Sequence, residues 1–236
     1  MPKHRQDDSI LDSLTRAAEE KYLARLRRGP TRVRVSGRAI QLGDQAPDLD
    51  LEDSDGNRVQ LSDFWRDRPA VLMFWRHFGC GCGMERAELL KAERSQLKDA
   101  GADVVIIGQG EPPRARAYAE QFGLTEPILC DSDFRAYEAY GLPEGTSAQV
   151  VFDAPDEYLR GDPDAWRSLI QKRREAGRPL VDNPWQLPGE FVIDQRGTVR
   201  LAYRYQYCED YPDPRVLVAA VKEAKWELPI AAGVDL

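Results

Sequence analysis

Hydrophobic and polar positions along the chain alternate between short apolar runs and longer segments of helical composition. The apolar runs are continuous, which is typical of strands buried on both faces of a sheet. The runs, each followed by a predicted helix, are residues 70–75 before 84–97, 104–107 before 114–122, and 127–130 before 134–140. This regular alternation of strand and helix predicts an α/β domain with a central sheet.

Two further pairs of short segments predict hairpins. Apolar and polar side chains alternate at residues 48–51 and 59–61, on either side of a DSDGN turn sequence. Residues 191–194 and 198–203 flank the turn QRG, and a helix is predicted after them at 214–226. Because hairpin strands are antiparallel, the predicted sheet is mixed and flanked by helices.

Residues 144–189 interrupt this pattern with a proline-rich stretch. One helix is predicted within it, at 163–176, with Asp162 as its N-cap and Gly177 after its end. A segment of about 45 residues is small for an independent core. We therefore expect an insertion or a lid-like segment, and we expect the main domain to cover residues 41–236.

The amino-terminal residues 1–40 differ from the rest in charge. They carry ten Lys or Arg and five Asp or Glu, whereas the whole chain has a net charge of −7. Apolar residues recur near helical spacing in this basic arm, which predicts a helix capped by Asp8 or Ser9 and stopped by Gly29-Pro30. Two interpretations stay open: a docking or dimerisation helix, or an appendage packed on its own domain.

Composition narrows the classes of protein. Of the 236 residues 31% are charged, and no window approaches 18 uninterrupted apolar residues, so no membrane-spanning helix is predicted. The first residues lack the apolar core of a secretory signal, and the negative net charge argues against general affinity for nucleic acid. Four cysteines are too few for a disulfide scaffold. We expect a soluble, cytoplasmic protein with no cofactor.

Two of the cysteines, Cys80 and Cys82, lie where a buried strand passes into a helix. Unpaired peptide N–H groups at a helix start stabilise a thiolate and lower the thiol pKa from about 8.5. Arg76 and His77 lie just upstream and Arg86 just downstream, and each cation would lower that pKa further. Cys80 is therefore the candidate nucleophile, and Cys82 is the candidate thiol that resolves its oxidised form.

Several alternatives to this pair stay open. Zinc would need two more ligands from Cys130, Cys208 and His77, whose spacings are unhelpful, and no metal site is predicted. His77 is either a general base or a stabilising cation, or else a partly buried strand-end residue. Cys130, at the carboxyl end of a predicted parallel strand, is a second candidate resolving thiol. Cys208 is more typical of a core or surface thiol than of a reactant.

Several motifs resemble those of the AhpC/TSA-type peroxiredoxin-like family, in particular its selenoprotein-U-like branch. The similar stretches are residues 42–49 (LGDQAPDL), 55–56, 61–64, 74–80 (FWRHFGC), 108–110, 131–133 with 137–141, and 189–194 with Gly197. The resemblance covers roughly residues 42–226 and implies a thioredoxin-like fold with thiol-based, antioxidant-type oxidoreductase chemistry. It also implies an external reductant, either a thioredoxin-type protein or a low-molecular-weight thiol.

The chain departs from the family pattern at three places. The second cysteine follows Cys80 by two residues instead of three. Met73 and His77 stand where peroxiredoxins have proline and threonine or serine, and Pro188 replaces an arginine before the late strand. The hydroxyl and guanidinium that would bind a peroxide are therefore absent from their usual positions, where Arg76 and His77 could substitute for them.

These observations lead to three hypotheses of function. The first is a thiol oxidoreductase that reduces peroxides or exchanges disulfides through Cys80 and Cys82, with Arg76 and His77 in support. The second is a non-catalytic thioredoxin-fold module that senses redox state or binds a partner through the basic arm. The third is a specialised biosynthetic enzyme that uses the same thiols on a small organic substrate. A homodimer is compatible with each.

Overall fold

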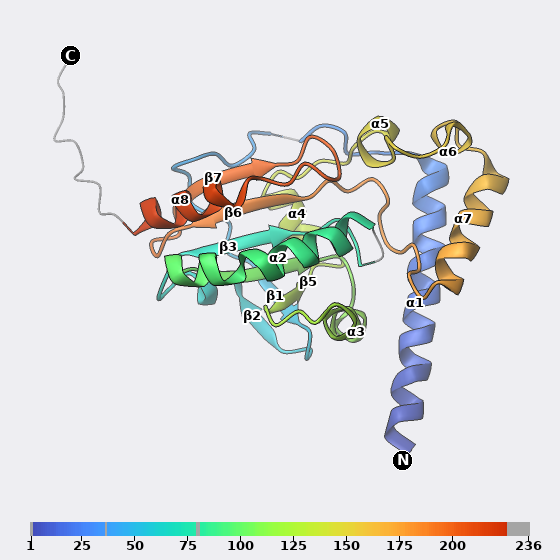
Figure 1. The fold of residues 1–236 in the computed structure, drawn as a ribbon, viewed down its shortest axis with the longest axis horizontal. Coiled ribbons are helices and arrows are strands. Elements are labelled where there is room, and N and C mark those ends of the chain that lie inside the picture. The colour runs from blue at the N-terminus through green and yellow to red at the C-terminus, as the bar shows by residue number, and fades with distance from the viewer. Residues whose placement is uncertain (1, 36, 79–80, 226–236) are drawn as a thin grey trace.

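The computed structural model describes residues 2–35, 37–78 and 81–225. Its centre is a seven-stranded mixed sheet (Figure 1). The strands, in their order across the sheet, are β2 (Arg58–Gln60), β1 (Asp50–Asp53), β5 (Ile128–Cys130), β4 (Asp103–Gly108), β3 (Ala70–Phe74), β6 (Gly189–Ile193) and β7 (Val199–Arg204).

The strand directions confirm the predicted mixed sheet. β3, β4 and β5 are parallel, because a helix crosses back between each successive pair. β6 is antiparallel to β3 and β1 is antiparallel to β5. The two predicted hairpins are the antiparallel pairs β1–β2 and β6–β7 at the two edges. The carboxyl ends of β3, β4 and β5 therefore share one edge of the sheet.

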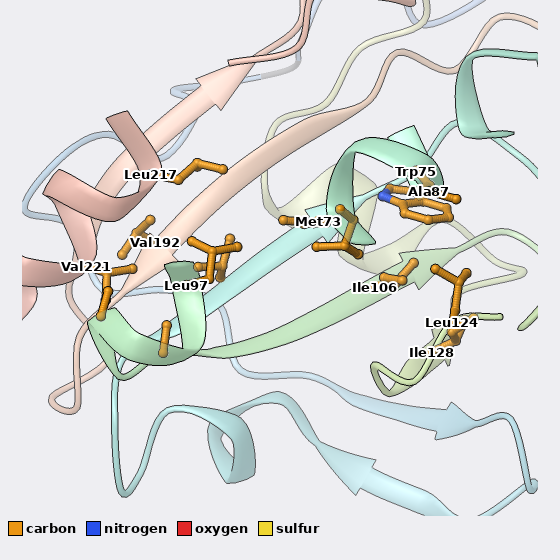
Figure 2. Packing of buried hydrophobic residues seen from close by; sticks show 14 of the residues in the cluster. Met73, Trp75, Ala87, Leu97, Ile106, Leu124, Ile128, Val192, Leu217 and Val221 are labelled. Carbon is orange, nitrogen blue, oxygen red and sulfur yellow. The ribbon is translucent and has the colours of Figure 1, made fainter. Parts of the chain in front are cut away.

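Helices cover both faces of this sheet. Val71 and Met73 of β3 face α2 (Gly81–Ala100), α3 (Pro112–Phe122) and α8 (Pro214–Ala224), and Figure 2 shows Met73 within this cluster. The alternate residues Leu72 and Phe74 face α4 (Arg135–Ala139) and the short 3-10 helix η1 (Leu61–Phe64). Since both faces of β3 are buried, its run of apolar residues is continuous.

The amino-terminal arm is a helix, α1 (Pro2–Arg28), that begins earlier than expected. The caps predicted at Asp8 or Ser9 are wrong, because both residues lie inside the helix. Proline is well suited to the first turn of a helix, where its missing N–H is not needed. The helix ends before Gly29, whose φ is +80°, as the sequence predicts.

The insertion contributes α5 (Ser147–Val150), α6 (Asp156–Leu159) and α7 (Pro163–Glu175), and α7 runs beside α1 (Figure 1). Tyr22 of α1 packs with Trp166 and Ile170 of α7, and Glu19 is bonded to Arg174. Asp162 caps α7 as predicted. The arm thus contacts its own chain, the arrangement that the second interpretation of this arm expects.

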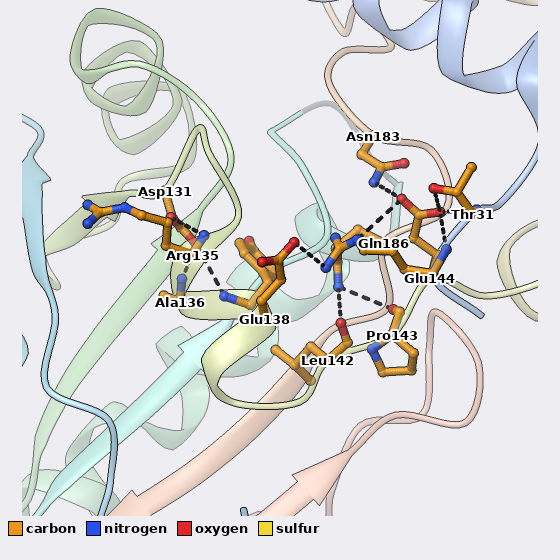
Figure 3. Close-up of polar contacts among 12 residues, drawn as sticks. Thr31, Asp131, Arg135, Ala136, Glu138, Leu142, Pro143, Glu144, Asn183 and Gln186 are labelled. Carbon is orange, nitrogen blue, oxygen red and sulfur yellow. Dashed lines mark hydrogen bonds and ion pairs between the residues drawn. The ribbon is translucent and has the colours of Figure 1, made fainter. Parts of the chain in front are cut away.

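A buried carboxylate ties the chain after α1 to both ends of the insertion (Figure 3). Glu144 accepts hydrogen bonds from the backbone N–H groups of Thr31 and Arg32 and from the side chain of Asn183. Arg32 in turn donates to Gln186 at 2.9 Å.

Within the described residues, no helix is long and apolar enough to cross a membrane.

Candidate functional site

The predicted site lies where β3 passes into α2. Gly79 and Cys80 fall outside the described residues, so the predicted nucleophile has no described position. α2 begins at Gly81, three residues before the predicted start, and this places Cys82 in its first turn. Cys82 is buried and disulfide-bonded, whereas Cys130 and Cys208 are free thiols.

The segment between β3 and α2 is held by neighbouring strand ends. The N–H of Trp75 donates to the carbonyl of Ile107 at 2.9 Å, and the Tyr137 hydroxyl donates to the carbonyl of Trp75 at 2.5 Å. The Gln109 side chain donates to the carbonyl of Arg76. Two of the motifs noted in the sequence, at 108–110 and 137–141, therefore position the residues that lead to Cys80.

Asp131 helps to position Tyr137, whose hydroxyl bonds to the carbonyl of Trp75. Its carboxylate accepts from the backbone N–H groups of Arg135 and Ala136 at the start of α4, at 3.0 Å and 2.8 Å (Figure 3). A carboxylate at a helix N-terminus satisfies N–H groups that would otherwise lack partners. The helix start is thus fixed, and Tyr137 in its first turn is directed at the end of β3.

Phe78, the last described residue before Cys80, lies against two glycines. A Cβ atom on Gly110 would come within 2.6 Å of its ring, and a Cβ on Gly108 would also collide with it. Both positions therefore need glycine so that the ring can approach the backbone. On its other side Phe78 packs against Tyr118, with ring centroids 5.0 Å apart.

Arg76 is a buried cation at this site. Its guanidinium donates to the carbonyl of Pro184, with Nε at 3.2 Å. Burial lowers the pKa of Arg76, while Cys208, Tyr22 and Glu209 act in the opposite direction. Arginine nevertheless stays protonated in proteins at neutral pH. Arg76 therefore supplies positive charge close to the Cys208 thiol.

His77 lies in a different electrostatic situation. It is buried with its ring edge-on to Tyr22, at 5.9 Å between centroids. Burial, and then the charges of Arg76, Arg173 and Arg114, lower its pKa well below 6.5. The imidazole is thus neutral at pH 7 and adds no positive charge. Of the chemical roles predicted for His77, that of proton acceptor stays a prediction.

The charge of Arg86 is compensated by buried carboxylates, and the expectation that it lowers the thiol pKa stays a prediction. Its guanidinium bonds to Glu190 of β6 at 2.7 Å and to Glu93 of α2 at 3.0 Å, and all three side chains are buried. The hydroxyl of Tyr205 also donates to Glu190, at 2.6 Å. Arg86 therefore fastens α2 to the sheet.

The two free cysteines differ in their surroundings. Cys130 ends β5, as predicted, but it packs into the main core. Burial raises its pKa to about 12, which keeps the thiol protonated and unreactive at neutral pH. Cys208 instead packs directly against Cys82. The sequence ranks Cys130 above Cys208 as a resolving thiol, and the packing favours the reverse.

Tyr118 lies next to the start of α2, and the sequence analysis did not identify it as a candidate site residue. Its hydroxyl lies 3.0 Å from the position of a Cβ on Gly83, in the first turns of α2. Among the described residues, this buried hydroxyl has no hydrogen-bond partner. Tyr118 and Phe78 also line a cavity of 380 Å³ between α1, α3 and residues 177–181.

A separate open groove lies beside the start of α2, where Glu85 lines it. Its volume is 640 Å³, and it is lined by Glu85, Ala148, Gln149, Phe152, Gln206, Tyr207, Glu209 and Tyr211.

Within the described residues, which exclude Cys80, no three His, Cys, Asp or Glu side chains are placed to hold a metal ion.

Comparison with known proteins identifies relatives of this chain. The AhpC/TSA family model matches residues 42–202. Thioredoxin-like protein AAED1, chloroplastic, from Arabidopsis thaliana is 30% identical over 77% of this chain and 73% of its own length. Mouse Peroxiredoxin-like 2C is 30% identical over 72% of this chain and 76% of its own.

Solved structures support the fold. Peroxidoxin BcpB from Mycobacterium tuberculosis superposes with a TM-score of 0.56 at 18% identity, over 79% of this chain and 99% of that protein. A peroxiredoxin-like protein from Aquifex aeolicus also gives 0.56, at 17% identity, over 83% and 92% of the two chains. At these identities the likeness concerns the thioredoxin-like architecture alone.

Proposed function

The chain belongs to the AhpC/TSA family of thiol-dependent redox proteins, and we propose that it is an oxidoreductase in which Cys80 is the nucleophile and Cys82 the resolving thiol. Arg76 supplies positive charge that favours the Cys80 thiolate, together with the N–H groups at the start of α2. His77 accepts a proton. An external thiol restores the reduced form.

With a peroxide, the proposed reaction has two steps. The Cys80 thiolate attacks one peroxide oxygen, the O–O bond breaks, and the other oxygen leaves as an alcohol or water after taking a proton. Cys80 is then a sulfenic acid. The Cys82 thiol attacks that sulfur, water leaves, and a disulfide forms. Two thiols of the reductant then reduce the disulfide and are themselves oxidised.

The observation that supports this proposal most directly is the state of Cys82. It lies in the first turn of α2, is disulfide-bonded, and packs against a second cysteine that Arg76 approaches. A buried structural cysteine in a core, such as Cys130, has none of these features. The reactive-pair interpretation accounts for all of them.

Exchange with a disulfide substrate is the second candidate, and the residues at the peroxide-binding positions favour it. His77 stands at the position of the family's hydroxyl residue and has no hydroxyl, and its imidazole is buried and neutral. Here Cys80 would attack a substrate sulfur and Cys82 would release the mixed disulfide. The groove beside α2 provides room for a polypeptide substrate.

The test is a pH titration of Cys80 alkylation by iodoacetamide, combined with turnover of peroxide and of a disulfide substrate under excess dithiol. We expect a Cys80 pKa below about 8.5 and loss of turnover in Cys80→Ser. Cys130→Ser is the matched control and should retain turnover. An ordinary Cys80 pKa, together with unchanged turnover in Cys80→Ser, would refute the proposal.

A further inference from the structure

Cys208, a free cysteine, packs against Cys82, a disulfide-bonded one. The two side chains form a small buried cluster of their own, and each is 5% exposed. Cys82 is disulfide-bonded and Cys208 is free. Thiol–disulfide exchange needs this arrangement, because the attacking sulfur must reach the sulfur that it displaces from its partner.

The loop that carries Cys208 is fastened to the start of α2 and to the insertion. The Tyr211 hydroxyl donates to the carbonyl of Cys82 at 2.9 Å. The N–H of Cys208 donates to the carbonyl of Gln149 in α5 at 2.9 Å, and the Gln149 side chain donates to the carbonyl of Gln206 at 2.8 Å. The packing of the two cysteine side chains is therefore built into the fold, and α5 helps to hold it.

The surroundings of Cys208 also give the exchange a direction. Burial raises the pKa of Cys208, while the nearby charge of Arg76 acts against this rise. In exchange between thiols, the less basic thiol is the better leaving group, and the more basic thiol retains the disulfide. A Cys80 thiol of lowered pKa would thus be released in favour of Cys208.

We propose that Cys208 is a third redox thiol of this site, an inference that rests on the proposed function of Cys80 and Cys82. The Cys208 thiolate attacks the Cys82 sulfur of the Cys80–Cys82 disulfide. The Cys80–Cys82 bond breaks, a Cys82–Cys208 bond forms, and Cys80 leaves as a thiolate that takes up the proton given by Cys208. No net oxidation or reduction occurs in this step.

This exchange frees Cys80 for another turnover and moves the disulfide beside the 640 Å³ groove. Phe152 and Tyr207 form an exposed aromatic pair at the groove, with ring centroids 5.4 Å apart, and Glu85 and Glu209 supply carboxylates. An external thiol reductant that enters the groove would come next to the Cys82–Cys208 disulfide, because Tyr207 and Glu209 on either side of Cys208 line it. The insertion contributes to this approach through Gln149 and Phe152.

The test is disulfide mapping by mass spectrometry after non-reducing digestion. The reduced protein is treated with one equivalent of hydrogen peroxide and quenched at successive times. We expect a Cys80–Cys82 disulfide first and a Cys82–Cys208 disulfide later, with the later species lost in Cys208→Ser and kept in Cys130→Ser. If Cys80–Cys82 forms and no Cys208 disulfide follows, this inference is overturned while the proposed function stands.

A second variant separates the two proposals. In Cys80→Ser, oxidation with diamide bypasses the peroxide step and leaves Cys208 unaltered. We expect a Cys82–Cys208 disulfide in this variant, detected as faster migration on a non-reducing gel because a long loop is closed. Its absence from the folded variant would overturn the inference. Failure of the wild-type protein to form any disulfide with peroxide would instead count against the proposed function.

Discussion

Replacing Arg86 by methionine tests whether this arginine is a structural cation or a modulator of the thiol. The side chain is 4% exposed and bonds to Glu190 and Glu93, which are also buried. Methionine fills part of the volume and removes the charge. Two carboxylates then stay in the interior without their cation, between α2 and β6.

The magnitude follows from the bonds that are lost. Each hydrogen bond to a charged group contributes about 1.5–3 kcal/mol, and removal of one partner of a buried ion pair costs about 3–5 kcal/mol. We therefore expect Arg86→Met to lower the free energy of unfolding by about 3–5 kcal/mol. Lys91→Met is the control on the same helix. Lys91 pairs with Glu88, which is 67% exposed, and its loss should cost at most about 1 kcal/mol.

The assay is urea denaturation followed by circular dichroism, with the thiols kept reduced, at pH 5 and pH 8. An uncompensated buried carboxyl binds protons more tightly in the folded state, so stability of Arg86→Met should fall as pH rises. The deficit should therefore be smaller at pH 5. A loss no greater than that of Lys91→Met, with a Cys80 pKa raised by about one unit, would refute the structural role.

Three other substitutions test how the site and the arm are held. Gly108→Ala places a Cβ against the ring of Phe78, and it should slow alkylation of Cys80; an unchanged alkylation rate would contradict the positioning role of that ring. Tyr137→Phe removes the hydroxyl that bonds to the Trp75 carbonyl and should lower the free energy of unfolding by about 1–3 kcal/mol; a variant as stable as wild type in urea would count against this. Trp166→Ala opens a cavity between α1 and α7, of a kind that costs about 3–5 kcal/mol. It should speed proteolysis within α1, and equal cleavage rates would show that the packing matters little.

Much of the fold was predictable because its signals are local. The apolar run that forms β3, the two hairpins and the capped helix α7 lie close to their predicted limits. Such elements depend on side-chain period, turn residues and caps within a few positions of each other. The predicted start of α1 is too late because the apolar residues at helical spacing begin only at Ile10, whereas the helix begins at Pro2.

The sequence predicted which residues lie around the candidate site, but it predicted their chemical roles less well. Its place at the end of β3 follows from the strand-to-helix pattern around Cys80. The sequence could not show that Arg86 is neutralised by Glu190, which lies in a distant strand. It also could not show that burial and neighbouring arginines keep His77 neutral. The pKa of a side chain depends on its burial and on the charges around it. Both are set by segments that are distant in the sequence and meet only in the folded protein.

The amino-acid sequence alone predicted the α/β alternation, the mixed sheet, a Cys-Gly-Cys between a strand and a helix, and the helix of the basic arm. The tertiary structure then determined which side chains contact one another. It packed Cys208 against Cys82, buried Cys130 in the core and laid α1 along α7. The physical reason is the range of each effect. Backbone preference and the period of hydrophobic residues act over a few positions. The burial of a cysteine and its side-chain contacts are set by segments that lie far apart along the chain.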